Sequence, residues 1–136
     1  MADGRQGAVL APAQQSLVDA QLRAFVDAVD GVRTAVLATV DGFALVQAPA
    51  TASGERLAAM TSAMLALAAA VGRELALGEL EVLMLEAGEG KVLMRTLPAP
   101  GAPLLLMAAC DTRSVIGNVL WSAKECGQKI LAGLGD

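Results

Sequence analysis

The 136-residue chain has no histidine and no tyrosine, and its aromatic residues are one Trp and two Phe. Without histidine, the commonest general base, the imidazole metal ligand and the usual hydrolase triad are absent. The chain also has no basic run, and its aromatic content of 2% is too low for a base-stacking surface. We therefore expect neither an independent enzyme nor a nucleic-acid-binding protein, and no metal or other cofactor.

Cysteine is scarce as well. Cys110 and Cys126 are too few for a disulfide framework, and their spacing is not that of a zinc pair. The first residues of the chain include Asp3, Arg5 and Pro12 and lack the sustained apolar stretch of a signal peptide. Together these features predict a cytoplasmic protein.

One short motif invites a phosphate-binding interpretation, which fails. The phosphate-loop pattern around Gly90-Lys91 needs a glycine where this chain has Leu85, and a Ser or Thr where it has Val92. The segment Gly88-Glu89-Gly90 is instead typical of a tight hairpin turn.

Aliphatic residues dominate what is present. Apolar residues make up 55% of the sequence, and the net charge is −4. A chain of this length buries about 70% of the surface that its unfolded form exposes, so we expect one hydrophobic core. We predict a disordered N-terminal tail at residues 1–14 and a single domain at residues 15–136.

Hydrophobic spacing and turn residues predict the order helix, two strands, helix, three strands, helix. Ser16 is the expected cap of the first helix, and the last helix is expected to begin at Asp111. Asp41-Gly42 between two β-type runs predicts a type I′ hairpin. The strand at residues 80–86 is apolar on both faces, as expected for a strand covered on both sides. The strands are predicted at residues 33–40, 43–48, 80–86, 91–97 and 104–110, in an antiparallel sheet flanked by helices.

Ser53 or Gly54 is expected to open a long helix, which is apolar almost all the way round at residues 57–75 and so needs partners on several sides. Its length is close to that of a membrane span, but its polar residues and alanines make it weakly hydrophobic, and we expect no such span. Gly78 is expected to end it. The large residues Leu57, Met60, Met64, Leu67, Val71 and Leu75 form one side, predicted to face the sheet, and the opposite side carries Ala59, Ser62, Ala63, Ala66, Ala70 and Arg73.

Several short motifs occur in an order and spacing typical of one known family. They are Asp30-Gly31-Val32, Asp41-Gly42-Phe43-Ala44, Leu57-Ala58-Ala59-Met60, Gly78-Glu79-Leu80, Gly90-Lys91-Val92-Leu93, Leu104-Leu105-Leu106-Met107-Ala108 and Ile116-Gly117. Across residues 17–134 the chain thereby resembles the Roadblock family, which contains roadblock-type dynein light chains and bacterial partners of Ras-like GTPases.

The resemblance implies an α+β fold with about five antiparallel strands in the order 2-1-5-4-3. The long helix covers one face of this sheet, and the two terminal helices cover the other. Family members form homodimers through the long helix and the third strand. The dimer-interface residues that this implies here are Ala59, Ala63, Ala66, Ala70, Val82 and Met84.

The resemblance also implies partners. In several bacterial members the dimer binds a small Ras-like GTPase, and some members activate it without inserting a catalytic arginine. In its alanine content and its proline-rich loop at residues 98–103, the chain departs from the better-known polarity regulators. It is closer to the actinobacterial members found beside a sensor-kinase-like protein and a GTPase, so a sensor-kinase-like protein joins the expected partners.

Three features of the sequence each allow two interpretations. The small residues of the long helix form either a seam between two copies or an intramolecular contact under a loop. Trp121 either covers the N-terminal helix or tail, or anchors a partner. Arg56 and Arg73 are either solvated charges at the helix ends or contacts to an acidic partner.

The leading hypothesis is a non-enzymatic homodimer that binds a small Ras-like GTPase and regulates it by stimulating hydrolysis or by scaffolding. The alternative is a structural adaptor subunit of a larger complex with no GTPase contact.

Overall fold

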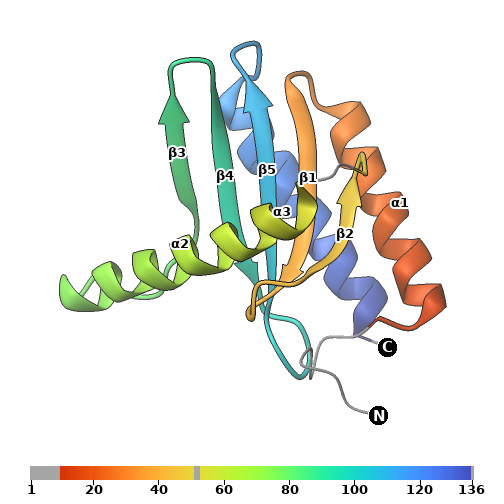
Figure 1. The fold of residues 1–136 in the computed structure, drawn as a ribbon, viewed down its shortest axis with the longest axis horizontal. Coiled ribbons are helices and arrows are strands. Elements are labelled where there is room, and N and C mark those ends of the chain that lie inside the picture. The colour runs from red at the N-terminus through yellow and green to blue at the C-terminus, as the bar shows by residue number, and fades with distance from the viewer. Residues whose placement is uncertain (1–9, 51–52, 136) are drawn as a thin grey trace.

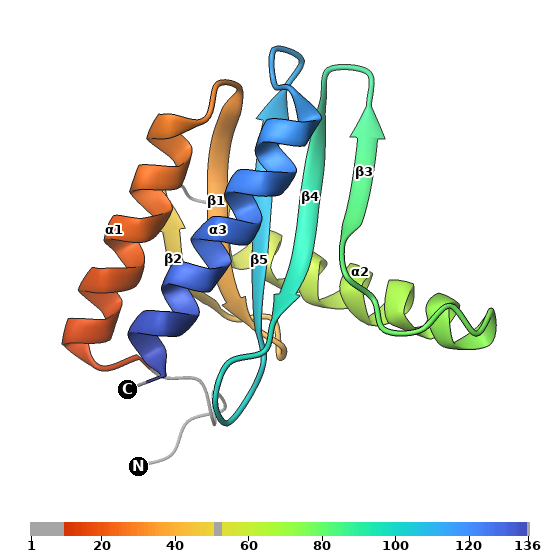
Figure 2. The ribbon, with the colours of Figure 1, turned by 180° about the vertical axis from the view of Figure 1, so that it is seen from behind.

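Three helices pack on the two faces of a five-stranded antiparallel sheet in the computed structural model, which describes residues 10–50 and 53–135 (Figure 1). The strand order is β2-β1-β5-β4-β3, as the resemblance implied. One face of the sheet carries α2, and the opposite face carries α1 and α3 (Figure 2). The elements are α1 (Pro12–Ala28), β1 (Val32–Thr39), β2 (Ala44–Ala48), α2 (Gly54–Glu74), β3 (Leu83–Ala87), β4 (Gly90–Leu97), β5 (Leu104–Asp111) and α3 (Ile116–Leu134).

The face covered by α1 and α3 holds the larger hydrophobic core. The helices approach the sheet and each other closely, because small residues stand at their contacts. A Cβ atom at Gly127 would lie 2.7 Å from Leu97 Cδ2 of β4, and Gly133 packs in the same way against Leu17 of α1. The buried residues of this core include Val18, Leu22, Phe25, Leu37, Leu93, Leu106, Val119, Ala123, Cys126 and Ile130.

Helix α1 begins at Pro12, four residues before the predicted cap Ser16, so the predicted tail at residues 1–14 is too long by the helical residues 12–14. Residues 1–9 lie outside the described residues. Proline suits the first turn because its missing N–H needs no partner there. The side-chain oxygen of Gln14 accepts a hydrogen bond from the Ala11 N–H at 2.9 Å and caps the helix.

The β1–β2 hairpin turns through four residues and not through a type I′ pair. Only Gly42 has a positive φ, of 91°, whereas a type I′ turn needs one at both central residues. The Gly42 N–H donates to the Thr39 carbonyl at 3.0 Å, and the Phe43 N–H donates to Thr39 Oγ1 at 3.1 Å. These bonds favour a wider turn, in which the left-handed residue is the glycine.

The first half of α2 is fixed on this hairpin. The Ser62 hydroxyl donates to the Val40 carbonyl, and Glu55 Oε1 accepts a hydrogen bond from the Ala44 N–H at 3.4 Å. At Gly42 a Cβ atom would lie 3.1 Å from Ala59 Cα, so the turn and the helix are nearly in backbone contact. This close approach holds the first turns of α2 against the hairpin.

The side of α2 that faces the sheet matches the predicted one only in part, because Leu57 and Met64 of the predicted side pack against the core there. Ala58, Thr61 and Leu65 are buried against the sheet, whereas Met60 and Leu67 of the predicted sheet-facing side are exposed. A helix with apolar residues all round has no unique sheet-facing side.

Helix α2 ends at Glu74, before the predicted stop at Gly78. Ala76 has a positive φ of 55°, and the Leu77 N–H donates to the Gly72 carbonyl at 2.8 Å. This is a Schellman motif in which alanine occupies the position that usually carries glycine. The second half of α2 extends past β3, beyond the edge of the sheet (Figure 1).

The two edges of the sheet differ. Strand β3 begins at Leu83 and is half-buried to exposed along its length, so the prediction of a strand covered on both sides is wrong. Strand β2 is shorter than predicted and is protected by α1, because Gln15 Nε2 donates to the Leu45 carbonyl at 3.0 Å. Pro49 follows β2 directly and offers no N–H to a further strand.

Helix α3 begins at Ile116 and not at the predicted Asp111, which is the last residue of β5. The Asp111 carboxylate accepts hydrogen bonds from the Arg113 backbone N–H at 2.9 Å and from its guanidinium, and these bonds hold the pKa of Asp111 below its usual range. The Ser114 hydroxyl donates to the Asp111 carbonyl at 2.8 Å. The residues after β5 therefore form a side-chain-stabilised turn before the helix starts.

Among the described residues, α2 is the one helix long and apolar enough to cross a membrane by length and composition. That property alone is weak support for a span. The contacts of Ala58, Thr61 and Leu65 with the sheet and the exposed apolar side described below account for the apolar character of α2.

Candidate functional site

The side of α2 that points away from the sheet is apolar and exposed. We call it the outer face of α2 and define it by Ala59, Met60, Ala63, Leu67, Ala70 and Val71. Met60 is 51% exposed, Leu67 69% and Val71 50%. Ala59 and Ala63 are exposed and Ala70 is half-buried. Contiguous exposed apolar surface of this kind marks an interaction site in soluble proteins.

The exposure follows from the geometry of the fold. The second half of α2 has passed the edge of the sheet, so no strand of the same chain lies beneath it (Figure 1). Leu75 and Leu77, at the end of the helix, are exposed as well. Arg56 near the start of α2 and Glu74 at its end are exposed charges that border the outer face.

The residues predicted for a dimer interface lie in two places. Ala59, Ala63 and Ala70 belong to the outer face of α2, and Ala66 is exposed beside it. Val82 and Met84 are half-buried and pack against the core on the α1–α3 face of the sheet. Val82 also precedes β3.

The three residues predicted to contact a partner do not form one site. Arg56 and Arg73 are exposed at opposite ends of α2. Trp121 lies on α3, which covers the other face of the sheet, and its exposed fraction is 65%. Within the described residues, α1 therefore leaves Trp121 largely uncovered.

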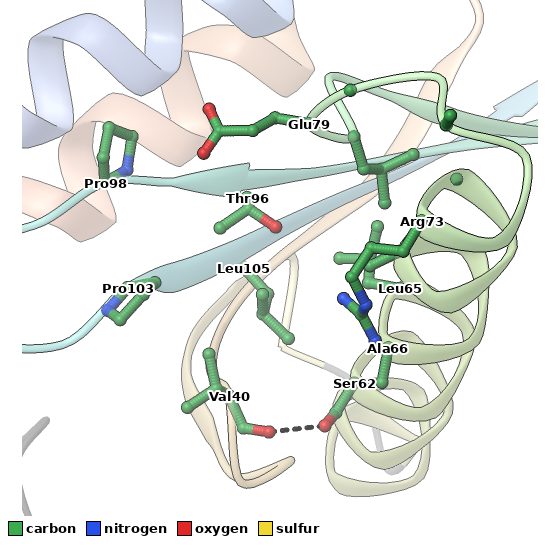
Figure 3. A pocket seen from close by; sticks show the side chains of 15 residues that line it. Val40, Ser62, Leu65, Ala66, Arg73, Glu79, Thr96, Pro98, Pro103 and Leu105 are labelled. Carbon is green, nitrogen blue, oxygen red and sulfur yellow. Dashed lines mark hydrogen bonds between the residues drawn. The ribbon is translucent and has the colours of Figure 1, made fainter.

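A groove opens beside α2, on the same face of the sheet (Figure 3). Its volume is about 830 Å³. Arg73 lies along the α2 wall, and Glu79, from the segment after α2, extends toward Pro98 and Thr96 on the other side (Figure 3). The remaining lining is mostly apolar and includes Leu65, Ala66, Ala69, Leu80 and Leu105.

Sequence reasoning missed this groove and the exposure of Met60, Leu67 and Val71. The apolar residues all round α2 were the signal for an extra partner. Residue size predicted the exposed Ala59 and Ala63 correctly but placed Met60, Leu67 and Val71 against the sheet. No local pattern indicates the groove, because it depends on how α2 crosses the ends of β4 and β5.

The described residues offer little for catalysis or metal binding. Residues 10–50 and 53–135 contain no group of three or more Cys, Asp or Glu side chains placed to hold a metal ion. Cys110 and Cys126 are buried and free. Burial raises the pKa of Cys110, and raises that of Cys126 to about 11, so neither side chain is an activated thiolate near neutral pH.

The fold and these surfaces define a small α+β domain with an uncovered apolar helix face. The model of the Roadblock/LC7 domain matches residues 18–104. The chain belongs to the Roadblock/LC7 family. No match was found among curated proteins.

Solved structures show the same fold. The Roadblock/LC7 domain from Streptomyces avermitilis has a TM-score of 0.79 at 17% identity, over 87% of this chain and 98% of that one. The gliding protein MglB from Thermus thermophilus has a TM-score of 0.79 at 19% identity, over 93% and 95%. MglB from Myxococcus xanthus has a TM-score of 0.77 at 16% identity, over 92% of each chain. At these identities the likenesses show a shared fold.

Proposed function

We propose that this protein is a homodimeric, non-enzymatic regulator that binds a small Ras-like GTPase in the cytoplasm. The observation that carries the proposal is the exposed apolar outer face of α2 on a Roadblock/LC7 fold. The family contains bacterial partners of Ras-like GTPases, which supports the choice of partner. A sensor-kinase-like protein is a further proposed partner.

The dimer is proposed to bury the outer face of α2 against a second copy. The small residues Ala59, Ala63 and Ala70 let two helix axes approach closely, and Leu67 and Val71 supply apolar area. Strand β3 is an uncovered edge next to this helix, so the second copy can also continue the sheet there.

The non-enzymatic role is supported by the chemistry of the chain. There is no histidine in the sequence, and both thiols have raised pKa values through burial. Regulation then depends on contact with a partner that supplies its own catalytic groups.

Substitution of Ala63 by Glu tests the dimer. The new carboxylate would lie in the apolar seam, where an unpaired charge is strongly unfavourable, so Ala63→Glu should sediment as a monomer. Asn118→Glu, at an exposed position of α3, is the matched control and should sediment as the unaltered protein does. Circular dichroism checks that both variants fold. A folded Ala63→Glu protein that remains dimeric contradicts the seam.

The GTPase is tested separately. The tagged protein is used to capture partners from native extract, and the partners are identified by mass spectrometry. A specific partner with a GTPase domain, whose hydrolysis rate or nucleotide state is then measured with and without the dimer, supports the proposal. Capture of non-GTPase partners alone would indicate a structural adaptor.

A further inference from the structure

The groove beside α2 has the size and lining of a binding site. Its volume of about 830 Å³ falls within the roughly 300–1,000 Å³ of typical ligand sites. The walls are mostly apolar, and the hydrogen bond from Ser62 to the Val40 carbonyl holds one end in place (Figure 3). Pro98 and Pro103 stiffen the loop at the far side, because proline fixes its own φ. The groove is therefore preformed within one copy of the chain.

Two opposite charges border this apolar surface. Arg73 lies on the α2 wall, and Glu79 lies on the wall formed by the segment after the helix (Figure 3). The ion pairs of the described residues join Asp19 to Arg23, and Asp111 to Arg33 and Arg113, so neither groove charge has an ionic partner in that part of the chain. Both side chains are exposed and are free to meet a charge from another molecule.

We propose that this groove binds a short apolar segment of a partner protein that places a carboxylate beside Arg73 and a basic side chain beside Glu79. The apolar walls supply the affinity, and the two charges fix the direction in which the segment lies. The groove uses Ala69 and Gly72, which do not belong to the outer face of α2, and it shares Ala66 with the predicted dimer interface. The inference therefore goes beyond the proposed dimer and does not require the partner to be a GTPase.

The test uses a phage-displayed library of random dodecapeptides selected on the full-length protein. The best peptides are synthesised with a fluorescent label, and their affinities are measured by fluorescence anisotropy. We expect apolar peptides with one acidic and one basic residue in a constant order. Arg73→Glu should weaken their binding roughly tenfold or more, since charge repulsion replaces attraction. Ala69→Trp, which fills the groove, should abolish binding.

Two further variants sharpen the test. Lys129→Glu makes the same charge change at an exposed position of α3 that does not line the groove, and it should leave the affinity within about twofold. The double variant Arg73→Glu with Glu79→Arg should select peptides in which the order of the two charges is reversed. Arg73 and Glu79 are both exposed, so these variants are expected to fold even where Ala69→Trp does not.

Three results would overturn the inference. The first is a selection that returns no binder or no charge pattern, and the second is equal affinity of the selected peptides for Arg73→Glu and the unaltered protein. The third is a change of sedimentation in folded Ala69→Trp, which would assign the groove to contact between copies. None of these results depends on capture of a GTPase, so they leave the proposed function to its own test.

Discussion

The two faces of the sheet are completed in different ways. On one face, α1 and α3 lie side by side, and their small residues let the chain bury its larger core by itself. On the other face a single helix crosses the strands, and its second half continues past β3 with Leu67 and Val71 exposed. The first face serves folding within one chain. The second leaves apolar surface for another molecule to cover.

The largest expected effect contrasts the same substitution on the two faces. Leu106→Ala, at a fully buried position under α1 and α3, should lower the free energy of unfolding by roughly 2–5 kcal/mol. Leu67→Ala, on the outer face of α2, should change it by less than about 0.5 kcal/mol in dilute monomer. Urea denaturation followed by circular dichroism measures both.

Protein concentration makes this contrast sharper. The cost of Leu67→Ala should grow as the concentration rises, because association then buries the side chain, whereas that of Leu106→Ala should stay constant. Equal costs at every concentration would show that the two faces do not differ in this way.

The next effect probes how firmly α2 is fixed at its first half. Gly42→Ala forces a side chain into a left-handed backbone conformation and brings a Cβ atom to 3.1 Å from Ala59 Cα. We expect a loss of about 1–3 kcal/mol in the free energy of unfolding. Gly88→Ala, in the β3–β4 turn with open space around it, is the control and should cost less. A thermal melt of each variant measures the two losses of stability, and equal losses would contradict the role of Gly42.

A smaller effect, of opposite sign, is expected at the other end of α2. Ala76 has a φ of 55°, which an L-residue adopts at a cost and glycine adopts freely. Ala76→Gly should therefore raise the free energy of unfolding by about 0.5–1 kcal/mol, after the greater chain entropy of glycine in the unfolded state is subtracted. A destabilised Ala76→Gly protein would show that the helix does not end in this motif.

The smallest effect concerns Cys126, in the core on the face of the sheet that α1 and α3 cover. Burial raises the pKa of Cys126 from 9.0 to about 11, so the thiolate fraction of the folded protein at pH 8 is about a hundredfold below that of an unperturbed thiol. Iodoacetamide should therefore alkylate Cys126 far more slowly in the folded protein than in urea, as peptide mass spectrometry can measure.

The sign of the matching pH effect follows from the same shift. The protonated thiol is favoured in the folded state, so its contribution to stability is complete below about pH 9 and is lost as the pH rises through about 11. Rapid alkylation of Cys126 in the folded protein at pH 8 would mean that the contact between α1 and α3 opens readily.

Much of the fold was predictable from residue patterns, and the strand order was predictable from the family resemblance. Local signals identified α1, the β1–β2 hairpin, α2 and the last three strands, because turn residues and hydrophobic spacing act over a few positions. The errors arose where tertiary contacts decide. Asp41-Gly42 resembles a two-residue turn, but the hydrogen bonds of Thr39 favour a wider one.

The candidate site was less predictable than the fold. The importance of α2 was evident from its apolar surface, and Ala59 and Ala63 are exposed where a seam needs them. The sheet-facing side was predicted only in part, with Leu57 and Met64 packed against the core and Met60 and Leu67 exposed, because a helix with apolar residues all round has no unique sheet-facing side. Val82 and Met84 lie on the opposite face of the sheet, which a strand taken alone does not reveal.

The two sheet edges together set how far an assembly can grow. Gln15 of α1 donates a hydrogen bond to the Leu45 carbonyl at the β2 edge, whereas β3 presents an uncovered edge. A copy that joins through β3 uses up the open edge of both molecules, and what remains at either end of the joined sheet is a blocked β2. In the proposed dimer each chain therefore offers one open edge, so pairing through the sheet favours two copies over a continuing fibre.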